Sequence, residues 1–260
     1  MAFFEKEILK QAARRVAYSP ILMRSVIGML QNQIKVGKYR FSVESPRITD
    51  KTRMEIFYRR YEMNEIQLLR KYFRTPMDTI ELGGSLGVLS CFAIEQAQGR
   101  HFITAEADPE LFQVMYKNIK NNFPEKGVVM LNVGITGKSI SEITFAIPLI
   151  GTQGGSVEGS LVSSPSLKQI VVKARRLSDI LEEYNIGEYR LSCDIEGSEV
   201  SILIDDPNSL RNCRQIIIEL HDCQYGDRKW TIAEIADLIC RQGFRQQDQA
   251  GAVHVFERQH

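Results

Sequence analysis

The sequence contains no C-x-x-C pair, which is the spacing that a structural zinc site or a redox dithiol needs. Its five cysteines are odd in number and widely spaced, as is typical of proteins that stay in a reducing cytoplasm. No uncharged apolar run approaches the roughly 18 residues that span a bilayer, and the stretch MAFFEKEILKQAARR lacks the order of regions found in a signal peptide. We therefore expect a cytoplasmic protein that is neither exported nor transmembrane.

An excess of charge of one sign is also missing, because 33 basic residues face 32 acidic ones and the formal net charge is +1. This balance argues against a chain that coats nucleic acid. A chain of 260 residues can bury a sizeable core, and we expect one main domain with an extension.

The N-terminal segment, residues 1–40, is the local exception, since its basic residues clearly outnumber Glu5 and Glu7. Such a basic segment can lie on an anionic membrane surface or contact a glycan-assembly partner. It can also be a brace whose apolar face packs on the main domain while its lysines stay in solvent. We favour the brace.

Up to about residue 73 the apolar residues recur at helical spacing. One helix is predicted over residues 8–16, a second begins after Ser19 with Pro20 in its first turn, and a third covers about residues 53–73. We expect a helical extension, residues 1–73, that packs on or leads into a core domain of residues 74–260.

From residue 74 the pattern changes to alternating strands and helices, which is typical of a parallel sheet with helices on both faces. The predicted strands are residues 79–82, 101–106, 128–132, 190–194, 215–220 and 252–257, and the predicted helices are residues 87–96, 109–121, 198–204 and 232–240. The first part is βαβαβ, the half-fold that binds nucleotides. The sequence therefore predicts a Rossmann-like α/β domain.

Residues 134–176 interrupt this alternation with short strand-like pieces around a Gly- and Ser-rich loop, residues 151–166. Long loops in compact domains are often active-site lids, and a high density of glycine leaves the backbone mobile. A long hairpin insertion and a flexible cover over the substrate fit the sequence equally well.

The stretch IELGGSLGVLS places three glycines where the first core strand turns into a helix, so that the backbone can approach a ligand closely. Its spacing matches neither the dinucleotide pattern G-x-G-x-x-G nor a phosphate-binding loop, so phosphate ligands are disfavoured. Glu81, just before the glycines, suits a ligand ammonium, reached directly or through a backbone N–H. Glu106, at the end of the next strand, can accept both hydroxyls of a ribose. A ribose together with an ammonium points to S-adenosylmethionine (SAM).

The ordered motifs IELGGSLGVLS, TAEADPELF, LNVGI, RRLSDIL, LSCDIEGSEVSIL and IIIELH resemble the FkbM-like methyltransferases over about residues 61–221. The D-x-E-G-x-E element is the most distinctive part. The resemblance implies a seven-stranded SAM-methyltransferase sheet whose last strand is antiparallel. It also implies transfer of the SAM methyl group to a hydroxyl, often on a sugar, a glycan or a polyketide-like small molecule.

The resemblance also places the cofactor-binding residues. It puts Glu81, Gly83, Ser85 and Gly87 around the methionine part of SAM, Glu106 on the ribose, and Asn132 and Val133 beside the adenine. The chain departs from the family pattern in two places: Glu81 stands where Asp is commoner, and Gly84-Ser85-Leu86 replaces a more usual Ala-Asn and apolar run. Both changes keep charge and size, so SAM binding remains the expectation.

Methyl transfer needs an oxygen held near the methyl group and a group that accepts its proton. Asp194 and Glu196 follow one predicted strand, and Glu219 and His221 occupy matching positions on the next. Because ligands bind at the carboxyl ends of parallel strands, these side chains should face the same crevice as the glycine turn. We predict that Asp194 meets both SAM and the acceptor, and that Glu196 or His221 is the base.

These residues also have structural interpretations. Asp194 can form a turn and cap the helix that opens at Ser198, and His221 can be a hydrogen-bonded structural residue. Glu199 belongs in the first turn of its helix, where a carboxylate favours the helix dipole. Asp194, Glu196, Glu219 and His221 together form a plausible ligand set for a divalent cation, but their spacing is not specific, so we predict a site without a metal.

Three other functions fit the sequence less well. An inactive SAM-fold partner subunit would have no chemical reason to keep Asp194 and Glu196 together with the glycine turn. An NAD(P)-dependent dehydrogenase shares the half-fold but needs a different glycine spacing. A nucleic-acid methyltransferase would suit the basic N-terminal segment, yet the chain has no N-P-P-Y-like run. We therefore expect a small-molecule or glycan hydroxyl as the acceptor, and no nucleic acid.

Overall fold

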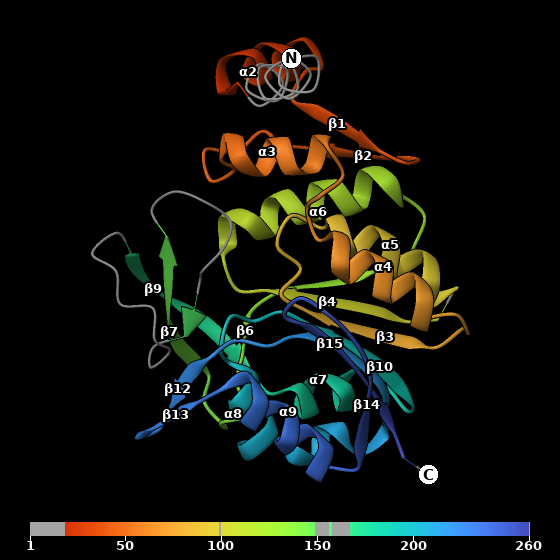
Figure 1. The fold of residues 1–260 in the computed structure, drawn as a ribbon, viewed down its shortest axis with the longest axis vertical. Helices are drawn as coiled ribbons and strands as arrows, with labels where there is room; N and C mark the ends of the chain where they lie inside the picture. The colour runs from red at the N-terminus through yellow and green to blue at the C-terminus, as the bar shows by residue number, and fades with distance from the viewer. Residues whose placement is uncertain (1–18, 99, 149–155, 158–166, 260) are drawn as a thin grey trace, which may run out of the picture.

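A seven-stranded sheet forms the centre of the protein (Figure 1). The computed structural model describes residues 19–98, 100–148, 156–157 and 167–259. The strand order is β14-β15-β11-β10-β3-β4-β5, and all neighbours are parallel except that β15 runs antiparallel to β11 and β14. The strands are β3 (Asp78–Leu82), β4 (Phe102–Glu106), β5 (Val129–Asn132), β10 (Tyr189–Cys193), β11 (Cys213–Glu219), β14 (Phe244–Ala250) and β15 (Val253–Arg258). The predicted fold class, including the antiparallel last strand, is confirmed.

Strand β14 was not predicted from the sequence pattern. Among the described strands it pairs only with β15, and most of its side chains (FRQQDQA) are at least partly exposed. Edge strands of this kind carry polar residues, which discourage further pairing, so the apolar run that marks a buried strand is absent.

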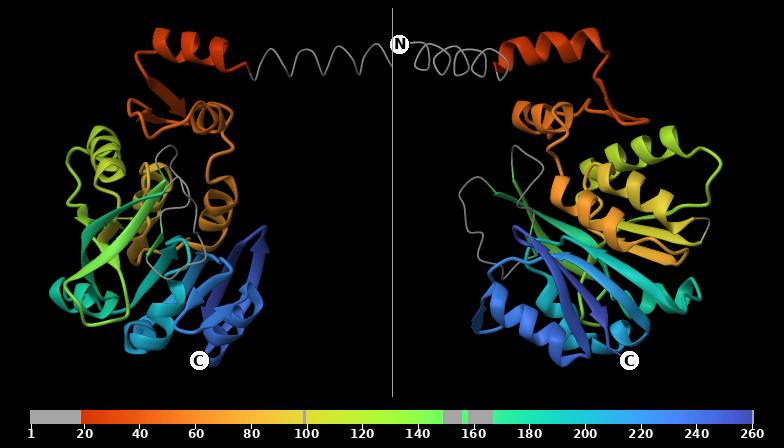
Figure 2. Two further views of the ribbon diagram at one scale, coloured as in Figure 1. Left: turned by 90° about the vertical axis from the view of Figure 1, so that its left-hand side faces the viewer. Right: turned by 45° about the vertical axis from the view of Figure 1, so that its right-hand side comes forward.

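Helices cover both faces of the sheet (Figures 1 and 2). Helices α4 (Met63–Tyr72), α5 (Val88–Ala97) and α6 (Pro109–Asn122) contribute to one apolar core, and α7 (Leu177–Glu183), α8 (Glu199–Asp205) and α9 (Ile232–Arg241) contribute to the other. A short 3-10 helix, η1 (Pro207–Asn212), follows α8. Because the strands before α5 and α6 are parallel, both helices begin at the same edge of the sheet.

The N-terminal extension differs from the predicted set of helices. It contains α2 (Pro20–Met29), a hairpin of β1 (Gln33–Val36) and β2 (Tyr39–Ser42), and α3 (Asp50–Phe57). The hairpin turns at Gly37, which has a φ of +62°. The predicted third helix is in fact α3 and α4, separated where Glu62 adopts a left-handed φ of +51°. The first predicted helix, residues 8–16, lies outside the described residues.

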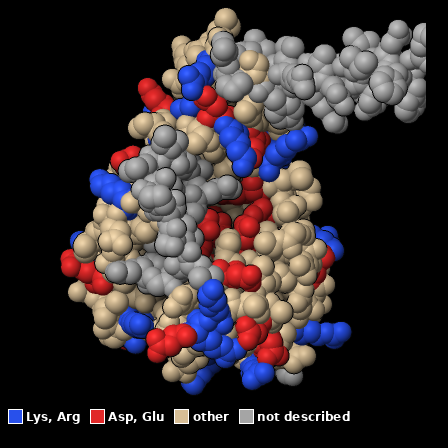
Figure 3. Space-filling view, turned by 60° about the vertical axis from the view of Figure 1, so that its left-hand side comes forward, with Lys and Arg blue, Asp and Glu red and all other residues tan. Residues whose placement is uncertain are grey.

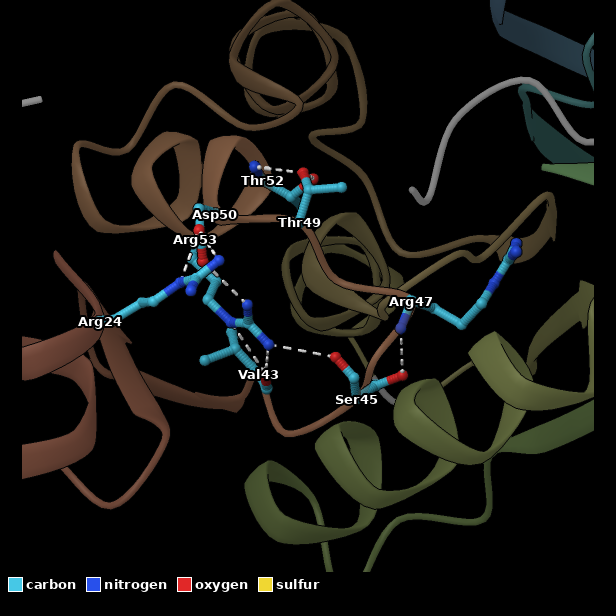
Figure 4. A network of polar contacts seen from close by, with 8 residues as sticks. All are labelled: Arg24, Val43, Ser45, Arg47, Thr49, Asp50, Thr52 and Arg53. Atoms are coloured by element: carbon cyan, nitrogen blue, oxygen red, sulfur yellow. Dashed lines mark hydrogen bonds and ion pairs between the residues drawn. The ribbon is translucent and has the colours of Figure 1, made fainter. Parts of the chain in front are cut away.

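Polar contacts join α2, α3 and the chain between them (Figure 4). Nε of Arg24 donates to Oδ2 of Asp50 at 2.7 Å, and Arg53 donates both to Asp50 and to the carbonyl oxygens of Val43 and Ser45. The described part of the basic segment thus packs on its neighbours as a brace would. A contact of residues 1–18 with a membrane or a partner stays a prediction.

A buried ion pair fixes the extension to the main domain. Nη2 of Arg47 lies 2.7 Å from Oδ2 of Asp108, and the two side chains are only 7% and 2% exposed. Asp108 is also the N-cap of α6, where it accepts hydrogen bonds from the backbone N–H groups of Glu110 and Leu111. The extension is therefore held above the edge of the sheet at which α6 begins.

The insertion forms a hairpin in its described part. Strand β7 (Glu142–Pro148) pairs antiparallel with β9 (Leu167–Arg175), which lies beside β6 (Gly134–Ile135). Apart from β8 (Ser156–Val157), the loop of residues 151–166 lies outside the described residues, so the predicted cover is not tested. A further hairpin, β12 (Cys223–Tyr225) with β13 (Arg228–Trp230), follows β11. Within the described ranges, no helix has both the length and the apolar character needed to cross a membrane.

Candidate active site

A cavity of about 570 Å³ opens at the carboxyl ends of the parallel strands, where the turns after β3 and β10 diverge. Its walls come from the strand ends, from the N-terminal extension and from Phe145 of the insertion. Figure 3 shows acidic side chains gathered in this hollow. The acidic residues of the lining are Glu55, Glu62, Glu65, Glu106, Asp108, Asp194, Glu196 and Glu219.

The glycine turn closes one side of the cavity. Gly83 has a φ of +87°, and a Cβ atom built on it would lie 1.8 Å from the backbone oxygen of Asp194. Only glycine fits there, because the turn after β3 passes directly beside the end of β10. Gly87, with a φ of +75°, is the N-cap of α5 and packs on Met115, whereas Gly83 and Ser85 line the cavity.

Glu106 lies on the cavity wall at the end of β4, as predicted. Its Oε2 accepts a hydrogen bond from the backbone N–H of Ser85 at 2.7 Å, and its Oε1 accepts one from the N–H of Asp108 at 2.8 Å. Burial raises the pKa of Glu106 to about 7, although these hydrogen bonds oppose the shift. Each carboxylate oxygen keeps a second lone pair that can accept a hydroxyl.

Glu81 lies beneath the glycine turn and is not among the residues that line the cavity. Its Oε2 accepts hydrogen bonds from the hydroxyls of Ser90 on α5 and Thr104 on β4, at 2.5 and 2.6 Å. Burial raises its pKa to about 7. A direct contact with a ligand ammonium, one of the two modes we considered, does not match this position. Glu81 instead supports the turn from below.

The ends of β10 and β11 bring the predicted catalytic residues together. Nε2 of His221 lies 3.5 Å from Oε2 of Glu196, 3.8 Å from Oε1 of Glu219 and 4.0 Å from Oδ1 of Asp194. All of these residues line the cavity, as the strand-end argument predicted. The other ring nitrogen, Nδ1, lies 3.7 Å from Oε1 of Glu199, whose side chain is fully buried.

The charges of this cluster are strongly coupled. Burial lowers the pKa of His221, but the carboxylates of Glu199, Asp194 and Glu196 outweigh burial and raise the pKa to about 10. Burial and the charges of Glu196 and Glu219 raise the pKa of Asp194 well above its usual range. At neutral pH the imidazole of the isolated protein is therefore a cation among carboxyl groups.

A family comparison matches residues 83–246 to the Methyltransferase FkbM domain, which is more than half of the chain. The chain belongs to the FkbM methyltransferase family. A comparison with curated proteins finds no match. The cofactor of this methyltransferase is SAM, and the predicted family is confirmed.

Several solved structures show a distant similarity. They include a protein of the NADB-Rossmann superfamily from Streptococcus agalactiae, with 12% identity over 75% of this chain and 68% of that chain and a TM-score of 0.44. The ribosomal protein L11 methylase of Lactobacillus delbrueckii subsp. bulgaricus has 12% identity, coverage of 75% and 77%, and a TM-score of 0.41. The magnesium protoporphyrin IX methyltransferase of Synechocystis PCC 6803, with bound SAM, has 9% identity, coverage of 75% and 80%, and a TM-score of 0.41.

The residues of this methyltransferase fit SAM. The cavity has the volume of a small-molecule site, and the Glu106 carboxylate faces it with free acceptor capacity for ribose hydroxyls. Val133 lines the cavity beside β5, while Asn132 supports the neighbouring turn by donating through Nδ2 to the backbone oxygens of Glu106 and Ala107. The residues predicted for the ribose and the adenine thus lie at the ends of adjacent strands, β4 and β5.

Several residues of the methyltransferase site were missed by the sequence analysis. They come from the N-terminal extension and the insertion: Arg47, Glu55, Arg60, Tyr61, Glu62, Glu65 and Phe145. The hydroxyl of Tyr61 lies 3.0 Å from Oγ of Ser85, so the extension reaches the predicted cofactor loop directly. The only sequence signal was that the family resemblance begins near Tyr61.

The extension adds carboxyl groups to the cavity, and one of them, Glu65, interacts with Glu219. Burial and the charge of Glu219 raise the pKa of Glu65 to about 7, although a backbone hydrogen bond opposes the shift. Glu62 accepts a hydrogen bond from the backbone N–H of Leu89, and burial together with the charge of Glu65 raises its pKa well above the usual range. The cavity is therefore lined, beside Glu219, by carboxyl groups that can both donate and accept hydrogen bonds.

Proposed function

We propose that this methyltransferase transfers the methyl group of SAM to a hydroxyl of a sugar, a glycan or a polyketide-like small molecule. The observation that carries the proposal is the set of carboxyl groups that line the cavity beside the glycine turn. Carboxylates accept hydrogen bonds from hydroxyls, and several of them can hold a molecule that carries many hydroxyl groups. Most of the ionisable groups of this lining are carboxyl groups, so it offers few cationic partners for the phosphates of a nucleic acid, which supports a small-molecule or glycan acceptor.

The arrangement of Asp194 supports its role at the boundary between cofactor and acceptor. Its backbone oxygen lies against Gly83 of the glycine turn, and its Oδ1 faces His221. When bound, SAM supplies an electrophilic methyl group on a positively charged sulfur. Asp194 is therefore in a position to contact the methionine end of the cofactor on one side and the acceptor on the other.

Glu196 is the residue that we propose as the base. Its carboxylate lines the cavity, and its backbone has a positive φ of +52°, which is unusual for a residue other than glycine. His221 is a cation at neutral pH in the isolated protein because its pKa is raised to about 10, so it is less suited to accept a proton. Its charge can instead hold the carboxylate of Glu196 in place.

The test is transfer of a radiolabelled methyl group from SAM to a panel of sugars, glycans and polyketide alcohols. Glu196→Gln should lower kcat at least tenfold while the affinity for SAM, measured by calorimetry, changes less than twofold, because general base catalysis typically contributes about 10²- to 10⁴-fold. The matched control is Glu110→Gln, an exposed residue of α6 that does not line the cavity.

Two results would contradict the proposal, and a third would invalidate the assay. Labelling of an amine or carbon acceptor, with no product from hydroxyl acceptors, would show that the acceptor class is wrong. SAM binding without transfer to any member of the panel would favour the alternative of an inactive partner subunit. Equal loss of kcat in Glu110→Gln would show that the assay does not report on the base.

A further inference from the structure

The imidazole and carboxylate groups at the ends of β10 and β11 have the arrangement of a cation site. Asp194, Glu219 and His221 each offer one potential ligand atom, and these atoms all lie within 4.8 Å of one another. We propose that the three residues bind a hard divalent cation, such as Mn²⁺ or Mg²⁺, which holds the acceptor hydroxyl. The binding of the cation stands independently, whereas its part in methyl transfer rests on the proposed function.

The distances between the three residues suit a shared ion. Nε2 of His221 lies 3.8 Å from Oε1 of Glu219 and 4.0 Å from Oδ1 of Asp194, which is too far for hydrogen bonds. Oxygen and nitrogen ligands that share one ion at about 2.0 to 2.2 Å lie about 3 to 4.4 Å from one another. The three side chains could therefore bind one ion with little rearrangement, provided that the ion displaces the protons that His221 and Asp194 hold in the isolated protein.

Unpartnered buried atoms provide a second, independent observation. Among the residues that the structure describes, Oδ1 of Asp194 and Oε2 of Glu199 are buried without a hydrogen-bond partner, and the Glu199 side chain is 0% exposed. Buried polar atoms are nearly always satisfied, so the unpartnered Asp194 oxygen, on the side of the cluster that Nε2 of His221 faces, indicates a ligand that the protein itself does not supply.

Glu199 has the position of a residue that orients a metal-binding histidine. Such histidines direct their second ring nitrogen toward a carboxylate or a carbonyl, which fixes the tautomer and the orientation of the ring. Nδ1 of His221 faces Oε1 of Glu199 at 3.7 Å, and this leaves Nε2 facing Asp194 and Glu219. The backbone N–H of Ile195 donates to the same Glu199 oxygen at 3.3 Å and holds the carboxylate in place.

The donor set selects the kind of ion and its chemistry. Two carboxylates with space for water suit Mg²⁺ and Mn²⁺, and one imidazole is compatible with Mn²⁺. A cation at this position would lower the pKa of an acceptor hydroxyl, and the proton would pass to the Glu196 carboxylate nearby. The sequence spacing alone favoured a site without a metal, but it could not show that Glu199 faces the second nitrogen of His221.

The experiment is a titration of the full chain with Mn²⁺ alone, followed by electron paramagnetic resonance, because free Mn²⁺ has a strong signal that is lost on binding. We expect one site per chain, at least tenfold weaker affinity in Glu219→Gln and His221→Asn, and about 10- to 100-fold weaker affinity in Glu199→Gln. The matched control is Glu95→Gln, which removes a carboxylate that pairs with Lys38 far from the cavity and should leave Mn²⁺ affinity unchanged.

A second measurement on the unmodified chain keeps the proposal testable if a variant fails to fold. Pulsed resonance should detect an imidazole nitrogen coupled to the bound Mn²⁺. Absence of Mn²⁺ binding, of that nitrogen coupling, or of any difference between Glu219→Gln and Glu95→Gln would overturn the site. Methyl transfer that continues unchanged in excess chelator would overturn the role of the cation in transfer. Calorimetric titration with SAM is a separate measurement. A chain that binds Mn²⁺ but not SAM would show that the proposed function has failed and that the cation site has not.

Discussion

The backbone N–H of Ser85 donates a 2.7 Å hydrogen bond to Oε2 of Glu106, which joins the glycine turn after β3 to the carboxylate at the end of β4. Oε1 of the same carboxylate accepts from the N–H of Asp108, the N-cap of α6. Two segments that border the cavity are therefore held by one side chain. Such support lowers the entropic cost of binding a ligand there, because these segments need less ordering when it binds.

Glu106→Gln should weaken SAM binding about 10- to 100-fold, because hydrogen bonds to a charged group contribute about 1.5 to 3 kcal/mol and glutamine keeps only one acceptor oxygen. Calorimetric titration with SAM measures the change, and Glu110→Gln on the exposed side of α6 is the control. Unchanged affinity in Glu106→Gln, with normal unfolding, would remove Glu106 from the ribose site.

Gly83→Ala should abolish SAM binding and destabilise the domain, because the added Cβ would lie 1.8 Å from the backbone oxygen of Asp194 and the φ of +87° is strained for alanine. Gly127→Ala is the matched control, since nothing lies within 4 Å of its Cβ position. The control should change the free energy of unfolding by less than about 1 kcal/mol. Similar urea midpoints and SAM affinities for the two variants would show that the turn can move away from β10.

The parts of the fold that follow local rules were predictable. Strands β3, β4 and β11 lie within a few residues of their predicted positions, because buried parallel strands are short apolar runs bounded by turns. The placement of Asp194, Glu196, Glu219 and His221 at one edge follows from the parallel direction of β10 and β11. The cofactor and the family were likewise predicted correctly from the ordered motifs.

The parts set by contacts between distant segments were not predictable. The helical pattern of the sequence continues through residues 58–62, yet the helix is interrupted there, between α3 and α4. Glu62, which has a left-handed backbone conformation, accepts a hydrogen bond from the backbone N–H of Leu89 of α5. The helix propensity of residues 58–62 could not predict this hydrogen bond, because Leu89 is distant in sequence. For the same reason Glu65 could not be assigned to the cavity, although its carboxyl group is coupled to that of Glu219.

Arg47→Met should lower the free energy of unfolding by about 3 kcal/mol, because it leaves the Asp108 carboxylate buried without its partner. Urea unfolding measures the change, and the exposed Arg100→Met is the control. Adding Asp108→Asn should recover part of the loss, since asparagine also caps α6 and no unpaired buried charge remains. A loss below about 0.5 kcal/mol in Arg47→Met would show that the pair does not fix the extension to the domain.

Glu81→Gln should change how stability depends on pH. Burial raises the pKa of Glu81 to about 7 in the folded chain, above its value of about 4.3 when unfolded. Between these two values the folded state holds a proton that the unfolded state has lost, so the free energy of unfolding falls as pH rises, by at most about 1.4 kcal/mol per pH unit. Glutamine keeps an acceptor for Ser90 and Thr104 but has no proton to lose, so the Glu81→Gln variant should lose less stability from pH 5 to pH 7 than the unmodified chain.

Urea unfolding at several pH values measures how the free energy of unfolding depends on pH in both proteins, and the exposed Glu182→Gln is expected to behave like the unmodified chain. Parallel slopes for Glu81→Gln and Glu182→Gln would mean that Glu81 is ionised in the folded protein throughout this range.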